Sequence, residues 1–413
     1  MPATPPRSHP LARSGFARNA DRMIARMWQH GLTVRPPLDP EFLWRKGSEG
    51  FELADEISVR SPEDVADFRD RLERLCTSLT EEAVLNALGH TMAYGQLTAA
   101  IRKRHALGRM WREQPELATA PIAPPIVVVG QMRAGTTRLH RLLSADPAHA
   151  GTRFCNALDP VPARPDWRPV KSGFTLALAR RINPWLDTLH PFGATRVDEE
   201  ISWLSYALDA CAYEAQWRIP SFVAFNEDTD STSIYREFAR ILRSDAAATG
   251  NAGLPRVLKC PQYSEALPAL LDQFPEARIV VAQRDDEAVL ESSISMVASQ
   301  SAFQSDHADL AAIRLEWRRK IALREARTEA ALADFAGPLA RVGFEELSKD
   351  SEATLQRVYK DLGIELSPAA RSAMARERAR ASRDGHKDHR AQIAGFGSKA
   401  GQPRAETAAV RQT

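Results

Sequence analysis

Two glycines five positions apart, Gly130 and Gly135, mark the stretch of this chain best suited to bind an anion. They follow a run of β-branched residues and precede a helix-compatible stretch, 136–143, so the order is strand, loop and helix. In such a unit the backbone N–H groups at the start of the helix converge on one point, and the helix dipole favours a negative charge there. We therefore expect the N–H groups of residues 134–137 to hold a phosphate-like group.

The loop departs in one place from the G-x-x-x-x-G-K-[ST] pattern of nucleotide triphosphatases. Thr136 occupies the position of the lysine that would reach the β- and γ-phosphates, and Arg133 supplies a cation from inside the loop instead. Without that lysine, triphosphate chemistry is poorly supported. A P-loop kinase or NTPase, with Asp285 as the metal-binding acid, stays open as an alternative on the sequence alone.

Two further basic residues each end a segment with strand character. Lys259 closes the run 256–259, and Arg284 follows the apolar run 277–283. Ser292 comes eight residues after Arg284, on a predicted helix. Because eight residues are just over two helical turns, the strand end and the helix face can meet at one ligand group. An arginine together with a hydroxyl suits a second phosphate, away from the glycine loop.

Five segments, in the same order along the chain, resemble the motifs of bacterial sulfotransferases that use 3′-phosphoadenosine-5′-phosphosulfate (PAPS). Residues 130–137 are similar to G-x-P-R-[TS]-G-T-T, with Met132 where proline is usual. The other four segments are 258–261, similar to L-K-[ST]-P; 274–279 followed by Arg284 and Ser292; 342–347, similar to V-x-Y-E-[DE]-L; and His389-Arg390 with Phe396-Gly397. The resemblance extends from about residue 121 to residue 397.

The resemblance implies a place for each part of PAPS, which would be the cosubstrate. The glycine loop would hold the 5′-phosphosulfate, while Arg284 and Ser292 would hold the 3′-phosphate. Lys259 would stabilise the leaving oxygen as it gains charge, and no metal is expected, because the protein's own cations neutralise the charge. The cosubstrate-binding residues implied are Gly130, Arg133, Ala134, Gly135, Thr136, Thr137, Arg284, Ser292, Phe344 and Arg390.

The general base is where this chain departs from the family pattern. Relatives place a histidine after the K-[ST]-P strand, or a glutamate in a W-E-x-x-x-P-x-P segment. Here Pro261 and Gln262 fill the first place and Asn156 the second. The remaining candidates are Glu199 or Glu200, ranked first, and His190, ranked second; with Lys259 and Arg133 they complete the predicted catalytic set. An acidic acceptor, such as a phenol, would need little help from a base.

The element pattern predicts an α/β fold, with a P-loop-type parallel sheet flanked by helices and a helical N-terminal region. We expect residues 1–120 to be helical behind a flexible basic tail, 121–397 to form the sulfotransferase domain, and 398–413 to be a tail. Ser61 before proline predicts a helix start, and residues 80–82 predict another. A short strand is expected at 341–344. The basic segment 371–390 is either a solvated helix face or a cationic lid.

The segment 151–250 is unusually aromatic. Trp203, Tyr206, Tyr213 and Trp217 keep near-helical spacing, so any single one of them can be explained as core packing. Taken together, so many aromatic residues beside a transfer centre favour an apolar acceptor pocket. We expect a small phenolic, aromatic or lipid-like acceptor rather than a bare sugar.

Composition argues against several other classes of protein. A net charge of +2 argues against broad nucleic-acid binding. The four cysteines are far apart, which indicates neither a zinc ribbon nor a disulfide framework and fits the cytoplasm. No apolar run is long enough to span a membrane. A transit peptide remains an alternative for the first residues. The oligomeric state stays open. A second alternative function is that of a catalytically impaired relative, which would bind nucleotide without transferring a group.

Overall fold

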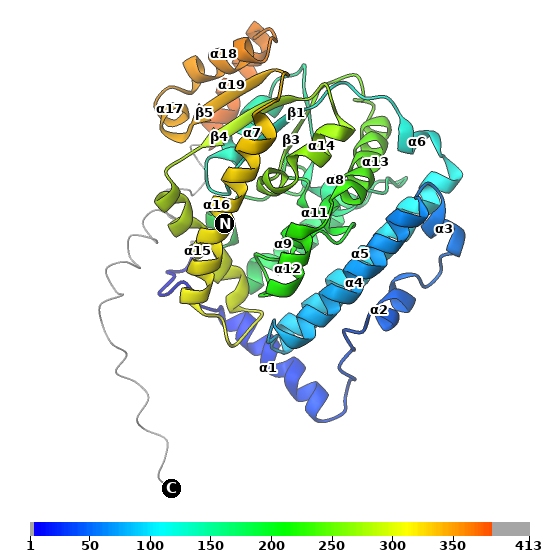
Figure 1. Ribbon diagram of the computed structural model, residues 1–413. Helices are drawn as coiled ribbons and strands as arrows, with labels where there is room; N and C mark the ends of the chain where they lie inside the picture. The colour runs from blue at the N-terminus through cyan, green and yellow to red at the C-terminus, as the bar shows by residue number, and fades with distance from the viewer. Residues whose placement is uncertain (1–3, 382–413) are drawn as a thin grey trace.

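A five-stranded parallel sheet lies at the centre of the computed structural model, which describes residues 4–381 (Figure 1). The strand order is β2-β3-β1-β4-β5, so the strand before the glycine loop is central and is paired on both sides. The α/β prediction is confirmed. The strands are β1 (Ile126–Gly130), β2 (Ala150–Gly151), β3 (Arg256–Lys259), β4 (Arg278–Gln283) and β5 (Leu339–Gly343).

Alternating residues of the strands face opposite sides of the sheet, and both sides are buried. Val127 and Val129 belong to one hydrophobic cluster, whereas Ile126 and Val128 belong to another. This is the period-two pattern of a strand covered on both faces. The covering helices are α7 (Thr136–Ser144), α13 (Thr232–Thr249), α14 (Leu267–Gln273), α15 (Asp286–Ala302), α16 (Leu310–Leu332), α17 (Phe344–Lys349), α18 (Ser351–Asp361) and α19 (Pro368–Ala381).

The register brings the carboxyl ends of three strands to one edge of the sheet. Val128 is paired with Lys259 of β3, and Gly130 is paired with Ala282 of β4. The glycine loop, Lys259 and Arg284 therefore leave neighbouring strands at the same end. In open α/β sheets this edge is where ligands bind.

The aromatic segment folds into short helices beside the sheet. Trp203, Tyr206, Tyr213 and Trp217 are all buried, so core packing accounts for these four side chains. Trp167 and Phe174, in contrast, are exposed. The elements of this segment not yet given are α8 (Phe154–Leu158), α9 (Arg168–Ile182), α10 (Leu186–Leu189), α11 (Ile201–Ser205), the 3₁₀ turn η1 (Ala210–Ala212) and α12 (Pro220–Asp228); a second 3₁₀ turn, η2 (Pro261–Glu265), follows β3.

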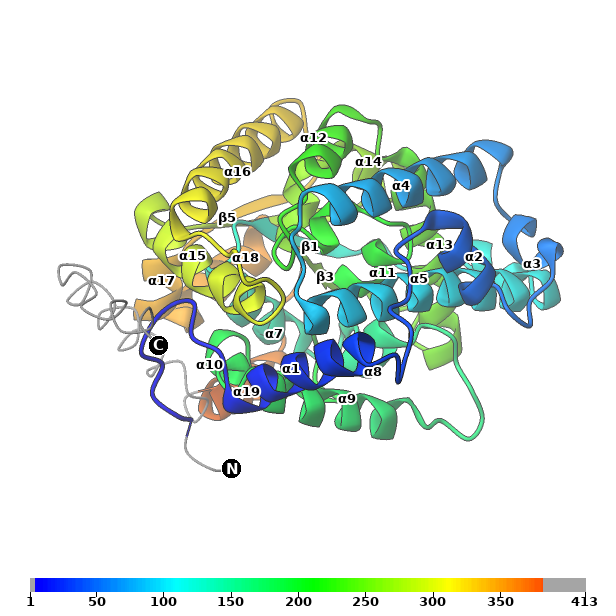
Figure 2. The ribbon, with the colours of Figure 1, turned by 90° about the horizontal axis from the view of Figure 1, so that it is seen from below.

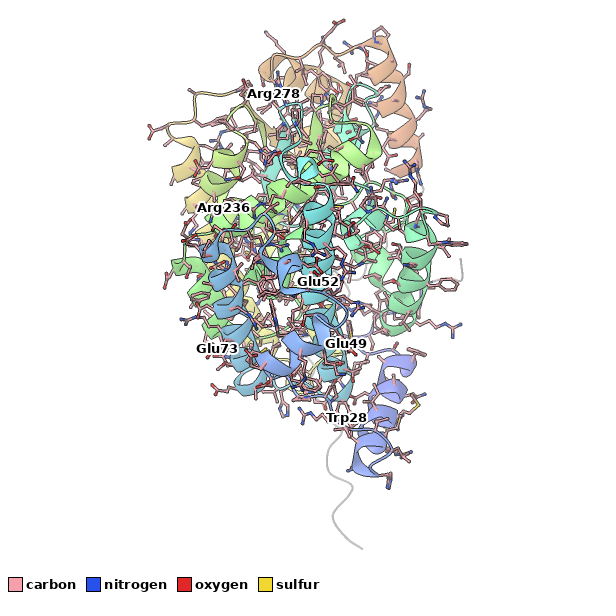
Figure 3. The ribbon with its side chains drawn as sticks, turned by 90° about the vertical axis from the view of Figure 1, so that its right-hand side faces the viewer. Trp28, Glu49, Glu52, Glu73, Arg236 and Arg278 are labelled. Atoms are coloured by element: carbon pink, nitrogen blue, oxygen red, sulfur yellow. The ribbon has the colours of Figure 1, made fainter. Side chains whose placement is uncertain are left out.

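The N-terminal region is helical, and no strand lies among its described residues 4–120. It packs on α13, where the buried Arg60 guanidinium lies 2.7 Å from the Glu237 carboxylate. Figure 3 shows Glu49, Glu52 and Glu73 on this side of the molecule. The helices are α1 (Gly15–Gln29), α2 (Pro40–Gly47), α3 (Leu53–Ile57), α4 (Pro62–Glu81), α5 (Ala87–Glu113) and α6 (Glu116–Thr119).

Two local predictions need correction, and one short strand was not predicted. Ser61 does cap α4, but residues 80–82 end that helix instead of opening another, and Asn86 caps the next one. The strand expected at 341–344 is 339–343, because Phe344 already begins α17. The two-residue strand β2 was missed because a segment so short has no periodicity.

The N-terminal tail is not loose over its described residues. Ser14 caps α1, and the buried Arg7 guanidinium donates to the Ser295 hydroxyl of α15 at 3.0 Å. Composition alone predicts a tail, but an arginine held against polar groups of a folded helix orders it. Among the described residues, no helix combines the length and apolarity needed to cross a membrane.

Candidate active site

The glycine loop can close only with glycine at both of its ends. Gly130 has φ +132° and Gly135 has φ +87°, both in the region that favours glycine. A Cβ on Gly130 would lie 2.4 Å from the carbonyl oxygen of Ala282, and one on Gly135 would lie 2.9 Å from the Phe344 ring. The loop backbone is therefore held against β4 on one side and the start of α17 on the other.

The loop leads directly into α7 and is also tied to a distant helix. Thr136 is the first residue of α7 and is buried, and the N–H of Ala134 donates to the Gln131 carbonyl at 3.1 Å. The Gln131 side chain donates to the Ile321 carbonyl of α16 at 2.8 Å. These contacts place the first N–H groups of α7 at the carboxyl edge of the sheet, as the sequence predicts.

The structure brings together the basic and hydroxyl side chains that the sequence places far apart. Arg133 donates through Nε to the Ser292 hydroxyl at 2.7 Å, and Arg284 donates to the Arg133 carbonyl at 2.7 Å. The Arg284 guanidinium also lies 4.2 Å from the centre of the Phe344 ring. Burial, together with the positive charge of Arg284 and against the opposing effect of Glu199, lowers the pKa of Arg133 to about 10.

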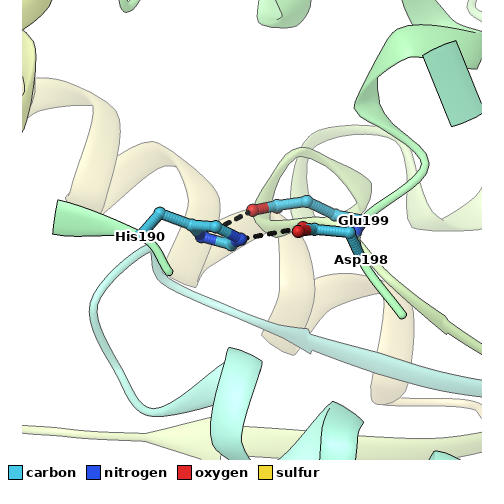
Figure 4. A group of neighbouring side chains, drawn as sticks. All are labelled: His190, Asp198 and Glu199. Atoms are coloured by element: carbon cyan, nitrogen blue, oxygen red, sulfur yellow. Dashed lines mark hydrogen bonds and ion pairs between the residues drawn. The ribbon is translucent and has the colours of Figure 1, made fainter. Parts of the chain in front are cut away.

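A series of ionisable side chains connects the end of β3 to the segment before α11. Figure 4 shows three of them, His190, Asp198 and Glu199. The Lys259 ammonium lies 3.0 Å from Glu199 Oε2, and Glu199 Oε1 lies 3.5 Å from His190 Nδ1. His190 Nε2 in turn lies 2.8 Å from Asp198 Oδ1. One carboxylate oxygen of Glu199 therefore contacts Lys259, and the other lies near His190.

Glu200, the next residue, faces a different environment. Its carboxylate is fully buried and accepts from the backbone N–H of Lys259 at 3.0 Å and from the Tyr263 hydroxyl at 3.1 Å. Burial raises its pKa to about 7, against the lowering effect of these hydrogen bonds. Glu200 therefore holds the end of β3, whereas the partly exposed Glu199 reaches the lysine side chain.

Asp198, a carboxylate that the sequence places beside the two glutamates but that was not ranked as a candidate base, is also a member of this site. Burial works to raise its pKa, but His190 and then Arg141 outweigh burial and lower the pKa to about 2. Asp198 also accepts from the backbone N–H of Glu199 at 2.9 Å, so it positions both His190 and Glu199. The consecutive acids at 198–200 were the only signal of it in the sequence.

The residues that replace the family's usual bases have structural partners. The Asn156 amide donates to the Asp245 carboxylate at 2.7 Å, and Gln262 donates to the Cys211 carbonyl at 3.3 Å. Both side chains are buried. Asp285, the metal-binding acid of the NTPase alternative, caps α15 by accepting from the N–H of Ala288 at 2.9 Å.

One group of candidate metal ligands coincides with this site. Ligand atoms of His190, Asp198 and Glu199 all lie within 4.8 Å of one another (Figure 4). The Lys259 ammonium already contacts Glu199 there, and a metal ion would compete with that cation. The absence of a metal requirement therefore stays a prediction.

The structure describes none of the C-terminal motif and only the first part of the basic segment 371–390. Arg390, together with His389 and residues 396–397, lies outside the described residues. In the described part of the basic segment, Arg371 and Arg378 of α19 both contact Glu352, at 3.8 and 3.5 Å. This arrangement fits a solvated helix face for residues up to 381.

Comparisons with known proteins show the family to which this chain belongs. The profile of the sulfotransferase family matches residues 124–368, which is more than half of the chain. The chain belongs to the sulfotransferase family. Its chemistry is accordingly the transfer of a sulfuryl group, and the sequence resemblance is confirmed at this level.

Two solved structures are similar over most of their length. Sulfotransferase STF1 from Mycobacterium tuberculosis H37Rv matches with a TM-score of 0.74 and 27% identity, covering 88% of this chain and 100% of that one. Sulfotransferase STF9 from Mycobacterium avium matches with a TM-score of 0.73 and 19% identity, covering 87% and 95%, and shows the shared fold. No curated protein matches this chain.

Proposed function

We propose that this sulfotransferase moves the sulfuryl group of PAPS to a hydroxyl or amine of a small, apolar or aromatic acceptor by in-line displacement. The observation that carries the proposal is the supply of positive charge at the carboxyl edge of the sheet. Among the described residues, the Lys259 ammonium has Glu199 as its one carboxylate partner, and Arg133 forms no ion pair. Both cations can therefore neutralise an anionic ligand beside the glycine loop.

Two anion sites divide the cosubstrate between them in this proposal. The N–H groups of residues 134–137 and the Thr136 and Thr137 hydroxyls receive the 5′-phosphosulfate. Arg284 and Ser292 receive the 3′-phosphate, with the Phe344 ring beside Arg284 near the adenine. Arg133, which contacts Ser292, lies between the two sites and provides charge to the sulfuryl end.

The transfer step requires one proton acceptor and one cation at the leaving oxygen. Glu199 takes the proton of the acceptor hydroxyl as a bond forms between that oxygen and sulfur. The bond from sulfur to the bridging phosphate oxygen breaks, and the electron pair stays on that oxygen, where Lys259 stabilises it. Glu199 is preferred to Glu200, because the latter is enclosed by the end of β3 and by Tyr263. His190, held by Asp198, sets the orientation of Glu199 and is the second candidate for the base.

Calorimetry with adenosine 3′,5′-bisphosphate and with 5′-AMP tests the cosubstrate assignment. The bisphosphate should bind more tightly, and Arg284→Ala should cost roughly 1.5–3 kcal/mol of its binding free energy, the range of a charged hydrogen bond. Arg318→Ala is the matched control, because that exposed arginine pairs with Glu287 on the surface. Equal affinity for the two nucleotides would remove the second phosphate site from the proposal.

Transfer of labelled sulfate from PAPS to a panel of phenols, lipids and sugars tests the reaction itself. Apolar and phenolic acceptors should be sulfated, and bare sugars should not. Tight binding of the bisphosphate without transfer to any acceptor would instead identify a nucleotide-binding relative that has lost catalysis.

A further inference from the structure

The exposed side of helix α9 carries several large apolar side chains. Val170, Phe174 and Leu178 recur at three- and four-residue spacing and are 48%, 74% and 54% exposed, and Trp167, which precedes the helix, is 58% exposed. The buried side carries Ser172 and Leu176 instead. A surface helix of a globular protein normally has the reverse arrangement, with its apolar residues buried. These four exposed residues form an apolar stripe of the kind that usually packs against another surface.

Helix α1 extends the apolar stripe. It packs against α9, and the Ser14 hydroxyl at its start donates to the Ile182 carbonyl at the end of α9, at 2.8 Å. Figure 2 shows the two helices next to each other along the lower edge of the molecule. Phe16 and Met23, seven residues apart and so on one side of α1, are 42% and 58% exposed. We call the exposed sides of α1 and α9 together the α1–α9 face.

Basic residues accompany the apolar ones on this face. Arg22 and Arg26 of α1 and Lys171 and Arg181 of α9 are exposed, and none of them contacts a carboxylate among the described residues. Helix α9 contains no acidic residue. Helix α1 has one acidic residue, Asp21, and its carboxylate accepts a hydrogen bond from the backbone N–H of Leu88.

We propose that the α1–α9 face docks on an anionic membrane surface. An apolar stripe that includes tryptophan and phenylalanine, bordered by arginine and lysine, is the composition of helices that lie in the plane of the lipid interface. The apolar side chains enter the acyl boundary while the cations meet phosphate headgroups. A second copy of this chain is a poorer occupant, because a two-fold interface would set the same cations against one another.

This proposal concerns a surface and does not depend on the identity of the sulfuryl donor or acceptor. Helices α2 to α4 show the contrast, since exposed acids such as Glu49, Glu52 and Glu73 lie there (Figure 3), the first two paired with Lys46 and Arg112. An anionic surface would attract the unpaired cations of the α1–α9 face more strongly than that side. The charge distribution therefore orients the molecule as well as binding it.

Co-sedimentation of the full chain with lipid vesicles tests the proposal. The protein should pellet with vesicles of phosphatidylcholine and phosphatidylglycerol and should remain in the supernatant with phosphatidylcholine alone. Phe174→Ser should lower the partition coefficient about tenfold, the effect of losing one buried aromatic side chain. Lys171→Glu combined with Arg181→Glu should abolish the preference for anionic lipid.

The matched control is Leu315→Ser, because Leu315 of α16 is 75% exposed but lies outside the α1–α9 face. It should bind vesicles like the parent protein. All of these positions are exposed, so the fold should tolerate the changes. The proposal is overturned if the parent protein ignores both kinds of vesicle, or if Leu315→Ser and Phe174→Ser lose binding equally. A parent dimer in sedimentation that Phe174→Ser converts to monomer, without vesicle binding, would assign the face to a second copy.

Discussion

Two clusters of buried charge in this protein contain the same kinds of residue and differ in how fully the charges are neutralised. At the carboxyl edge of the sheet, the Lys259 ammonium contacts one carboxylate, that of Glu199. On α16, Lys320 contacts three, at 3.0 Å from Glu214, 2.8 Å from Glu227 and 2.7 Å from Glu265. The comparison shows which positive charges are available to a ligand.

In the α16 cluster, formed by Lys320, Arg324, Glu214, Glu227 and Glu265, every cation is paired with carboxylates. Arg324 donates to Glu265 at 2.7 Å and also pairs with Glu214, so the two cations and their carboxylates satisfy one another. Burial works to lower the pKa of Lys320, but the surrounding carboxylates outweigh it and raise the pKa above its ordinary value. Glu265 ends the 3₁₀ turn that follows Lys259, so this cluster fastens the site to α16. We infer that its role is structural, and we propose that the cluster at the sheet edge supplies positive charge to an anion.

Breaking the α16 cluster should produce the largest effect, and it should fall on stability. Arg324→Met should lower the free energy of unfolding by about 3–5 kcal/mol, because it leaves buried carboxylates without a partner. Urea denaturation measures the change, and Arg318→Met, at an exposed arginine of the same helix, is the control. A loss below about 1 kcal/mol would mean that the cluster is more solvated than its burial indicates.

Removing the charge of Lys259 should spare the fold and affect the reaction. Lys259→Ala should lower turnover roughly 100- to 1,000-fold, the effect of losing one donor to a developing negative charge. Binding of adenosine 3′,5′-bisphosphate should change much less, because the contact strengthens only in the transition state. Parallel losses in affinity and turnover would instead make Lys259 a ground-state ligand.

Substituting the neighbouring glutamates separately should distinguish them. Glu199→Gln should lower turnover about 100-fold, with a smaller loss for phenols of lower pKa, as expected for a general base. Glu200→Gln, which keeps the shape and the hydrogen-bonding oxygen, should lose far less. Rates measured on a series of substituted phenols would decide the point. Near-parent rates for both variants would move the assignment to His190 or to a mechanism without a protein base.

The smallest expected effect is a pH dependence of stability from Glu200. Its pKa is raised to about 7 in the folded protein. The folded state therefore holds more protons than the unfolded state between about pH 4.5 and 7, and stability falls as the pH rises through that window. Glu200→Gln cannot ionise and should remove a decline on the order of 2 kcal/mol between pH 5 and pH 8. Urea denaturation at the two pH values would show it, and an unchanged slope would contradict a buried, titrating Glu200.

The local pattern of the sequence was sufficient to predict which residues meet at the carboxyl edge of the sheet. Gly130 and Lys259 end short strands, and Arg284 comes directly after a third. Parallel strands bring such ends to one edge of a sheet, and Gly135 lies in the loop that leaves the first of them. Ser292 follows from helical periodicity after Arg284. These features depend on neighbours within a few residues, so they can be predicted before the fold is known.

Only the tertiary structure separated Glu199 from Glu200. The two are adjacent and chemically alike, but one reaches the Lys259 side chain while the other is buried against the Lys259 backbone and Tyr263. Likewise, the sequence contains Lys320 and Glu265 without any sign that they meet. Which carboxylate is buried, and which cation is already neutralised, depends on contacts between segments far apart in the chain. Periodicity and spacing along the sequence carry no information about those contacts.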